Sequence, residues 1–192
     1  MTGGKWVEWA LLCDKGCEMG FRTGKKEENI RKDIYEAADA KLSRKSMTVY
    51  ELRAFLKDKG YEKAEIDALV DRYTELGYLD DKRYCGEYFD YAFKKNRSVR
   101  RTFSDLEEKG VAPDTIRDAF DEYEDINDKA VDERAMAERE AVRVLRAGGV
   151  FPDMAVPEKM KGRVGRKLYS FGYRESLVYD IIDDLDRINR EN

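Results

Sequence analysis

The chain has 192 residues, and 41% of them are charged, so we expect a thin hydrophobic core under a large charged surface. Histidine is absent, which excludes a Ser-His-Asp triad, a Cys-His pair and a histidine-based zinc site. Only three prolines interrupt a sequence rich in Ala, Leu, Glu, Lys and Arg, and this composition favours helices. The sequence therefore predicts an all-α fold with little or no sheet.

The cysteines are Cys13, Cys17 and Cys85, an odd number that does not indicate a disulfide framework. We expect Cys85 to be a small core residue, and we expect neither a metal site nor a cofactor. No apolar run approaches the ~20 residues that a membrane helix needs, and the start of the chain lacks a secretory cleavage pattern. These features predict a cytoplasmic protein that does not contact a membrane.

Residues 1–28 fit no repeat, and we interpret them as an N-terminal extension that forms a short strand or helix. The next segment predicts three helices, because apolar residues recur at spacings of three and four. The first helix carries Ile30, Ile34, Ala37, Ala38 and Leu42; the second carries Leu52 and Leu56 and ends at Gly60; the third carries Ile66, Leu69, Val70, Tyr73 and Leu76.

The second and third helices of this segment recur twice along the chain. A shift of 50 residues gives Leu106, Gly110, Ile116, Ala119, Phe120, Tyr123 and Ile126, and a shift of 112 gives Leu168, Gly172, Val178, Ile181, Ile182, Leu185 and Ile188. Every apolar position stays apolar, and every glycine stays glycine. We therefore predict three tandem three-helix repeats: 29–79, 80–127 and 128–192.

The repeated glycines have a physical role, because glycine adopts the left-handed conformation that ends many helices. Gly60, Gly110 and Gly172 are each followed by an apolar residue, which fits the hydrophobic contact across such caps. The first helices of the later repeats are predicted from Tyr84, Tyr88, Tyr91 and Ala92, with Phe89 and Phe93 beside them, and from Ala137, Ala141, Val144 and Leu145.

The connections between the predicted helices carry their own signals. Asp80 or Asp81 is expected to cap a helix, a role that we prefer to a pair of catalytic carboxylates because no histidine or metal partner is available. The acidic stretch 122–128 is expected to join the second repeat to the third, and 148–157 is expected to be a loop because it holds two glycines and two prolines. The three tyrosines of the 84–91 helix are expected in the core rather than stacked on nucleic-acid bases.

The net charge is −4, yet the charges are segregated. Residues 94–101 hold five basic residues and no acid, and residues 159–174 hold six basic residues and no acid, whereas 62–81 and 114–128 each hold seven acids. Each repeat is therefore predicted to have a basic second helix and an acidic third helix. The alternative is that these charges are solvated helix faces that form weak ion pairs with their neighbours.

Three segments resemble the RecX family of recombination regulators: 50–61 followed by Leu-Gly-Tyr-Leu-Asp-Asp-Lys-Arg-Tyr at 76–84, Leu-Glu-Glu-Lys-Gly-Val at 106–111, and Lys-Leu-Tyr-Ser-Phe-Gly-Tyr at 167–173. The resemblance covers roughly 36–188. It departs from the family at 96–100, where members often carry glycine, and in the first 35 residues, which look short.

The resemblance implies an elongated, curved array of three-helix repeats with no catalytic site. It implies a monomer that binds the RecA–DNA filament and modulates, usually inhibits, ATPase activity and strand exchange. The basic stripe would then contact RecA or the DNA backbone without reading sequence. The candidate partner-binding residues are Lys94, Lys95, Arg97, Arg100, Arg101, Lys161, Arg163, Arg166 and Lys167.

Two other functions stay open on the sequence. One is a helical DNA-binding protein independent of RecA, which the basic segment 94–101 motivates. The other is a helical-repeat scaffold for a protein partner, in which the basic residues are dispensable. An enzyme is the least favoured class, because no nucleophile–base pair or metal constellation is present in the sequence.

Overall fold

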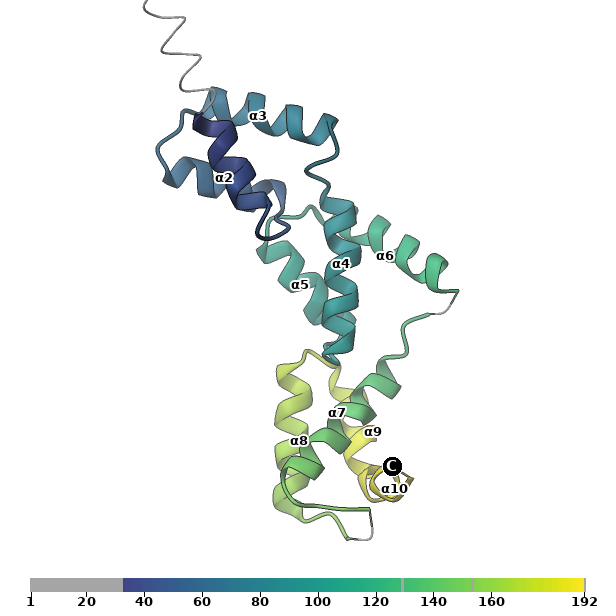
Figure 1. The fold of residues 1–192 in the computed structure, drawn as a ribbon. Helices are drawn as coiled ribbons and strands as arrows, with labels where there is room; N and C mark the ends of the chain where they lie inside the picture. The colour runs from purple at the N-terminus through teal and green to yellow at the C-terminus, as the bar shows by residue number, and fades with distance from the viewer. Residues whose placement is uncertain (1–32, 129, 153, 192) are drawn as a thin grey trace, which may run out of the picture. The chain divides into compact units, whose positions relative to one another are not determined.

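The computed structural model describes residues 33–128, 130–152 and 154–191, and in these residues every regular element is a helix (Figure 1). Residues 33–42 are helical, and the following helices are α2 (Val49–Asp58), α3 (Lys63–Glu75), α4 (Asp81–Lys94), α5 (Val99–Glu108), α6 (Pro113–Asn127), α7 (Glu133–Ala147), α8 (Glu158–Ser170), α9 (Glu175–Asp183) and α10 (Leu185–Glu191). The predicted all-α class is confirmed. Among the described helices, none combines the length and the apolar character that crossing a bilayer requires. The predicted extension at 1–28, with Cys13 and Cys17, lies outside the described residues.

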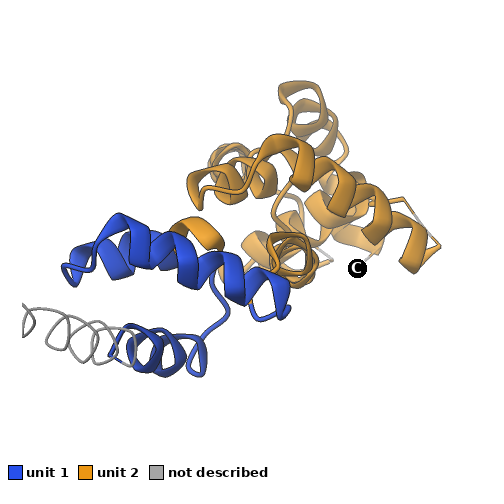
Figure 2. Cartoon of the chain, turned by 90° about the horizontal axis from the view of Figure 1, so that it is seen from above, with its two compact units in different colours: residues 1–47, 52–78 blue, residues 48–51, 79–192 orange. Residues whose placement is uncertain are grey.

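The chain divides into two compact units, coloured separately in Figure 2. Unit 1 consists of residues 1–47 and 52–78, and unit 2 consists of residues 48–51 and 79–192. The finer division into three repeats stays a prediction.

In unit 1 the helical residues 33–42 pack with α2 and α3 through the predicted apolar stripes. Leu52 and Leu56 of α2 are fully buried, and the buried side chains of α3 are Ile66, Leu69, Val70 and Tyr73. Leu76, which we expected on the same stripe, lies just beyond the end of α3 and is 50% exposed. That expectation was wrong because the buried face of α3 ends one turn earlier, at Tyr73.

In unit 2 an aromatic cluster joins α4, α5 and α6. The ring of Phe89 is fully buried and lies 5.5 Å from the rings of both Phe120 and Tyr123. Cys85 is fully buried on the same helix, as predicted. Two expectations about this core were wrong: Tyr91 is 50% exposed and Ile126 is 75% exposed. Ile126 lies in the last turn of α6, where that helix extends past the core.

The three repeated glycines end their helices in one common way. Gly60, Gly110 and Gly172 have φ angles of 91°, 80° and 86°. In each case the residue after the glycine donates its N–H to the carbonyl of the predicted leucine, Leu56, Leu106 or Leu168, at 3.2–3.3 Å. Each of these bonds satisfies a carbonyl that the helix end leaves free. The predicted glycine caps are confirmed.

The connections follow the predictions in part. Asp80 accepts a hydrogen bond from the Arg83 N–H and caps α4, while Asp81 accepts one from the Val49 N–H, each at 2.9 Å. The 148–157 segment lies between α7 and α8 as a connection. The acidic stretch 122–128 was wrongly expected to be the link between two repeats, because α6 continues through it to Asn127.

Candidate functional site

The turn after α4 docks on the turn after α8 within unit 2. The Ser98 N–H donates to the Phe171 carbonyl at 3.0 Å, and the Tyr173 hydroxyl donates to the Asn96 carbonyl at 2.8 Å. The Arg100 Nε–H donates to the Gly172 carbonyl at 3.1 Å. These contacts bring together the two basic segments that the sequence analysis singled out.

Asn96 also connects helix α7 to this junction between the turns after α4 and α8. This residue has a left-handed backbone with φ of 54°, which asparagine tolerates better than most side chains. Its side-chain oxygen accepts from the Arg139 Nε–H at 3.3 Å, and its amide nitrogen lies 3.5 Å from Glu140. Asn96 therefore links α4, α7 and the turn after α8.

Three hollows meet around the C-terminal end of α8. The first has a volume of about 430 Å³ and lies between α7 and α8; the second, of about 450 Å³, lies between the end of α4 and α7; the third, of about 330 Å³, lies between α5 and the end of α8. Arg143 lines the first two, and Ser170 lines the first and third. We call their basic residues together the cationic surface: Lys94, Lys95, Arg97, Arg100, Arg101, Arg143, Arg163, Arg166 and Lys167.

Two of these cations are engaged by a buried acid. The carboxylate of Asp105, whose side chain is 8% exposed, lies 2.6 Å from Arg97 Nη1 and 2.8 Å from Arg101 Nε. The Tyr88 hydroxyl donates to the same carboxylate at 3.1 Å, and burial, followed by the charge of Asp105, raises the pKa of Tyr88. Arg97 and Arg101 therefore neutralise a core carboxylate as well as adding charge to the surface.

Lys161 departs from the predicted set. It lies 3.0 Å from Glu158 and 3.8 Å from Asp186, and the hydrogen bond with Glu158 raises its pKa. It lines none of the three hollows described above. The structure therefore does not bring Lys161 together with the other predicted residues.

The cations of α8 that line the first hollow have no acidic partner among the described residues. Within the described part of the chain, Arg163, Arg166 and Lys167 make no ion pair, although Lys167 Nζ lies 4.0 Å from the centre of the Phe171 ring. A cation over an aromatic face is held by the charge distribution of the ring. Lys94 differs, because it lies 3.7 Å from Asp90 on its own helix.

The sequence analysis missed Arg143. Its Nη2 and Nε donate to the two oxygens of Glu140 at 2.6 and 2.8 Å, and this hydrogen-bonded pairing raises the pKa of Arg143. Glu140 is fully buried, while the Arg143 side chain is 63% exposed. The signal was in the sequence: Glu140 falls on the apolar stripe of Ala137 and Val144, where a carboxylate needs a cation three or four residues away.

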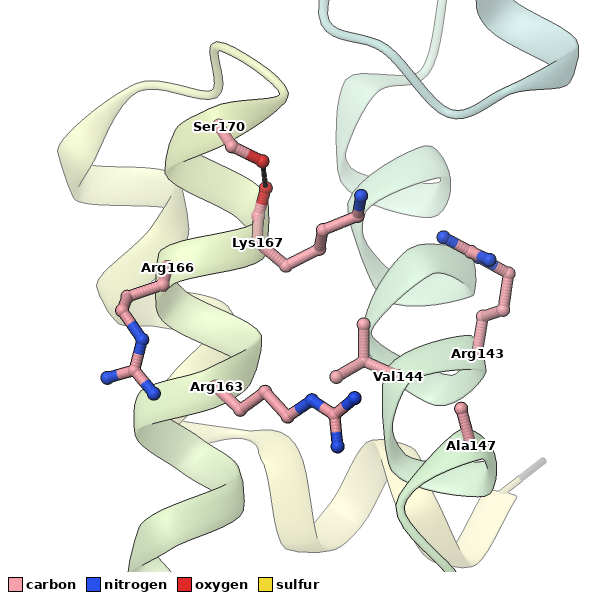
Figure 3. Close-up of a pocket in the computed structure, with 7 residues that line it drawn as sticks. All are labelled: Arg143, Val144, Ala147, Arg163, Arg166, Lys167 and Ser170. Atoms are coloured by element: carbon pink, nitrogen blue, oxygen red, sulfur yellow. Dashed lines mark hydrogen bonds between the residues drawn. The ribbon is translucent and has the colours of Figure 1, made fainter.

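Figure 3 shows the seven residues that line the first hollow. Arg163 and Lys167 extend from α8 toward α7, where Arg143, Val144 and Ala147 form the other wall. Arg166 points away from α7, and the Ser170 hydroxyl donates to the Lys167 carbonyl at 2.7 Å. The hollow therefore has cations on both walls, and the wall formed by α7 also carries an apolar patch.

The described residues thus define an all-helical protein that carries a cationic surface in unit 2. In the described residues, no group of three or more Asp, Glu or Cys side chains could hold a metal ion.

Comparison with known proteins places the chain in one family, although no family model matches it. The chain is 30% identical to the regulatory protein RecX of Trichlorobacter lovleyi over 157 residues, which are 81% of this chain and 97% of that protein. It therefore belongs to the RecX family. It is also 39% identical over 87 residues to the regulatory protein RecX of Vibrio parahaemolyticus and 25% identical over 181 residues to that of Lactobacillus johnsonii. These two matches cover 45% and 93% of this chain but 56% and 64% of the relatives, so the chain spans less than two thirds of either one.

Solved structures support the same fold. The crystal structure of RecX from Lactobacillus salivarius matches 83% of this chain and 99% of its own with a TM-score of 0.63 at 17% identity. A second crystal structure of regulatory protein RecX matches 96% of this chain and 81% of its own with a TM-score of 0.62 at 16% identity. At these identities the likeness concerns the fold.

Proposed function

We propose that this chain binds the RecA–DNA filament and inhibits its ATPase and strand-exchange activities. Membership of a family of regulatory proteins supports a regulatory role, and the cationic surface supports a polyanionic partner. The observation that carries the proposal is the convergence of residues 94–101 and 163–167 with Arg143 around the C-terminal end of α8. Charges gathered there would attract both DNA phosphates and acidic protein surface.

A titration of RecA's DNA-dependent ATPase tests the proposal. Purified chain, added from substoichiometric to equimolar amounts over RecA, is expected to lower the rate of ATP hydrolysis and of strand exchange. Raising the salt concentration should weaken the effect, because contacts to phosphate release counterions. A RecA that hydrolyses ATP and exchanges strands at its normal rates across the titration would contradict the proposal.

A second candidate is a DNA-binding protein that acts without RecA, which the same cationic surface favours. It predicts tight binding of duplex DNA by the chain alone. If the chain binds DNA tightly and leaves RecA unchanged, this second function replaces the first. If neutral substitutions on the cationic surface leave the effect on RecA intact, a protein-binding scaffold is the better description.

A further inference from the structure

The cations of unit 2 divide into those that the fold already uses and those that it leaves unmatched. Arg97 and Arg101 are bound to Asp105, Lys94 lies beside Asp90, and Lys161 lies beside Glu158. In the part of the chain that the structure describes, no acidic side chain pairs with the cations of α8 that line the hollow between α7 and α8, whereas Arg143 pairs with Glu140. Basic residues spread evenly over a surface would not divide into a paired and an unpaired group in this way.

The unmatched cations repel one another across the hollow. Arg163 and Lys167 are four residues apart on α8, a spacing that places them on one helix face. Like charges at this spacing destabilise a helix. The negative end of the helix dipole favours Lys167, in the last turn, but the effect does not extend to Arg163, near the middle. An anion between the two side chains would remove the repulsion.

Arg143 is held so that one edge of its guanidinium stays available. Buried Glu140 takes the Nε and Nη2 donors, and the remaining N–H groups of Nη1 and Nη2 point elsewhere. An arginine can bind two oxygens along each of its edges, and such a paired bond suits a phosphate. Glu140 therefore acts as a positioning residue that fixes the direction of Arg143.

The lining of the hollow indicates the chemistry of its ligand. No Asp or Glu is among the described residues that line it, and its apolar part is limited to Val144 and Ala147. A volume of about 430 Å³ is within the range of roughly 300–1,000 Å³ that is common for small-ligand sites. Such a hollow suits a compact ligand with several negative charges better than an apolar molecule.

We propose that the hollow between α7 and α8 binds an oligophosphate, two or three successive phosphate groups, with Arg143, Arg163 and Lys167 as ligands. Arg166, on the outer side of α8, adds charge at the rim. The phosphates belong either to a nucleic-acid strand or to a free oligophosphate. The inference rests on the proposed function only in taking the cationic surface as the part of the chain that meets a partner.

Two variants with the same loss of charge test this site. The hollow variant carries Arg163→Ala and Lys167→Ala. The control variant carries Lys159→Ala and Arg174→Ala, two exposed residues of the same basic segment that line none of the three hollows. Circular dichroism and thermal unfolding of both proteins establish that they fold.

Binding is measured with two probes, inorganic tripolyphosphate by calorimetry and a labelled single-stranded oligonucleotide by anisotropy. Whichever probe the wild type binds, the hollow variant should bind it at least roughly tenfold more weakly, since each charge-assisted bond contributes more than a neutral one. Its salt slope on the oligonucleotide should fall by roughly 1.4, the value for two single-strand phosphate contacts. The control variant should stay within about twofold of the wild type, because it keeps all the proposed ligands.

The outcomes identify the source of the phosphates and decide whether the proposed site exists. A selective loss for tripolyphosphate identifies a free oligophosphate, and a selective loss for the oligonucleotide identifies a nucleic-acid strand. Equal losses in both variants, or wild-type binding of both probes by the hollow variant, would overturn the site. An unchanged RecA ATPase with the site intact would instead overturn the proposed function alone.

Discussion

The hydroxyl of Tyr173 donates a 2.8 Å hydrogen bond to the backbone carbonyl of Asn96, and this bond joins the turn after α8 to the turn after α4. Tyr173 is 1% exposed and Asn96 is half-buried, so the bond is partly shielded from water. Both halves of the cationic surface depend on this junction, because the basic segments extend from the two turns.

Replacing Tyr173 with Phe should lower the free energy of unfolding by about 1–3 kcal/mol, the cost of a buried acceptor that loses its donor. The ring stays in place, so the loss reports the hydrogen bond. Urea unfolding followed by circular dichroism measures it. Tyr91→Phe is the matched control, because that side chain is half exposed and should change stability by less than about 0.5 kcal/mol. Equal stability of Y173F and the wild type would contradict this role.

Burial raises the pKa of Tyr173, followed by the charges of Glu133 and Glu140. A group whose pKa is higher in the folded state gives its full stabilisation below the unfolded pKa, near 10, and loses it as the pH rises above that value. The wild type should therefore lose stability more steeply above pH 10 than Y173F, by up to about 1.4 kcal/mol per pH unit. Urea midpoints measured across the alkaline range test the difference. Parallel curves for the two proteins would show that Tyr173 is not responsible.

Asp105→Asn should move stability and anion binding in opposite directions. The substitution keeps the shape but removes the charge that Arg97 and Arg101 share, so the free energy of unfolding should fall by about 1–3 kcal/mol. It also releases two cations to the surface, so oligonucleotide binding should become severalfold tighter. Asp114→Asn, which removes an exposed pair with Arg117, is expected to cost less than about 1 kcal/mol. Weaker oligonucleotide binding by folded D105N would argue against release of the two arginines.

Cys85 should be unreactive toward thiol reagents while the protein is folded. Its side chain is fully buried, and burial raises the pKa of its thiol to about 12, so little thiolate forms near neutral pH. In a Cys13→Ser, Cys17→Ser background, a chromogenic disulfide should label Cys85 only as fast as the fold opens. The same variant in denaturing urea is the control and should react at once. Fast labelling of the native protein would show that the thiol is accessible.

The sequence predicted those parts of the fold that depend on local periodicity. The leucine and glycine of each repeat, such as Leu106 with Gly110, lie where the pattern placed them. The pattern failed at helix ends, where Leu76 and Ile126 are exposed, because periodicity does not indicate where the neighbouring helix stops.

The candidate site was predicted only in part, because a local sequence pattern does not indicate contacts between distant segments. The two basic segments were visible in the sequence, and Asp105 was four residues from Arg101, so their pairing could have been foreseen. The link between Asn96 and Tyr173 is a contact between turns of different helices, which no local pattern encodes. Arg143 entered the site through the side chain of Asn96, whose contacts with Arg139 and Glu140 bring α7 beside the end of α4.

Alanine substitutions at Gly172 and Gly149 distinguish the cost of backbone strain from the cost of a steric clash. Both have left-handed backbones, with φ of 86° and 79°, so alanine at either position should cost about 1–2 kcal/mol in strain. A Cβ at Gly149 would meet no atom within 4 Å, whereas one at Gly172 would lie 2.6 Å from the Arg101 Cβ and 2.7 Å from the Ser98 Oγ. Gly172→Ala should therefore be less stable than Gly149→Ala by a further 1–3 kcal/mol or so, the usual cost of overpacking. Because the clash pushes the α5 turn away from the α8 turn, Gly172→Ala should also weaken oligonucleotide binding, which Gly149→Ala should leave unchanged. Equal urea midpoints for the two variants would mean that the turns are not in close contact in solution.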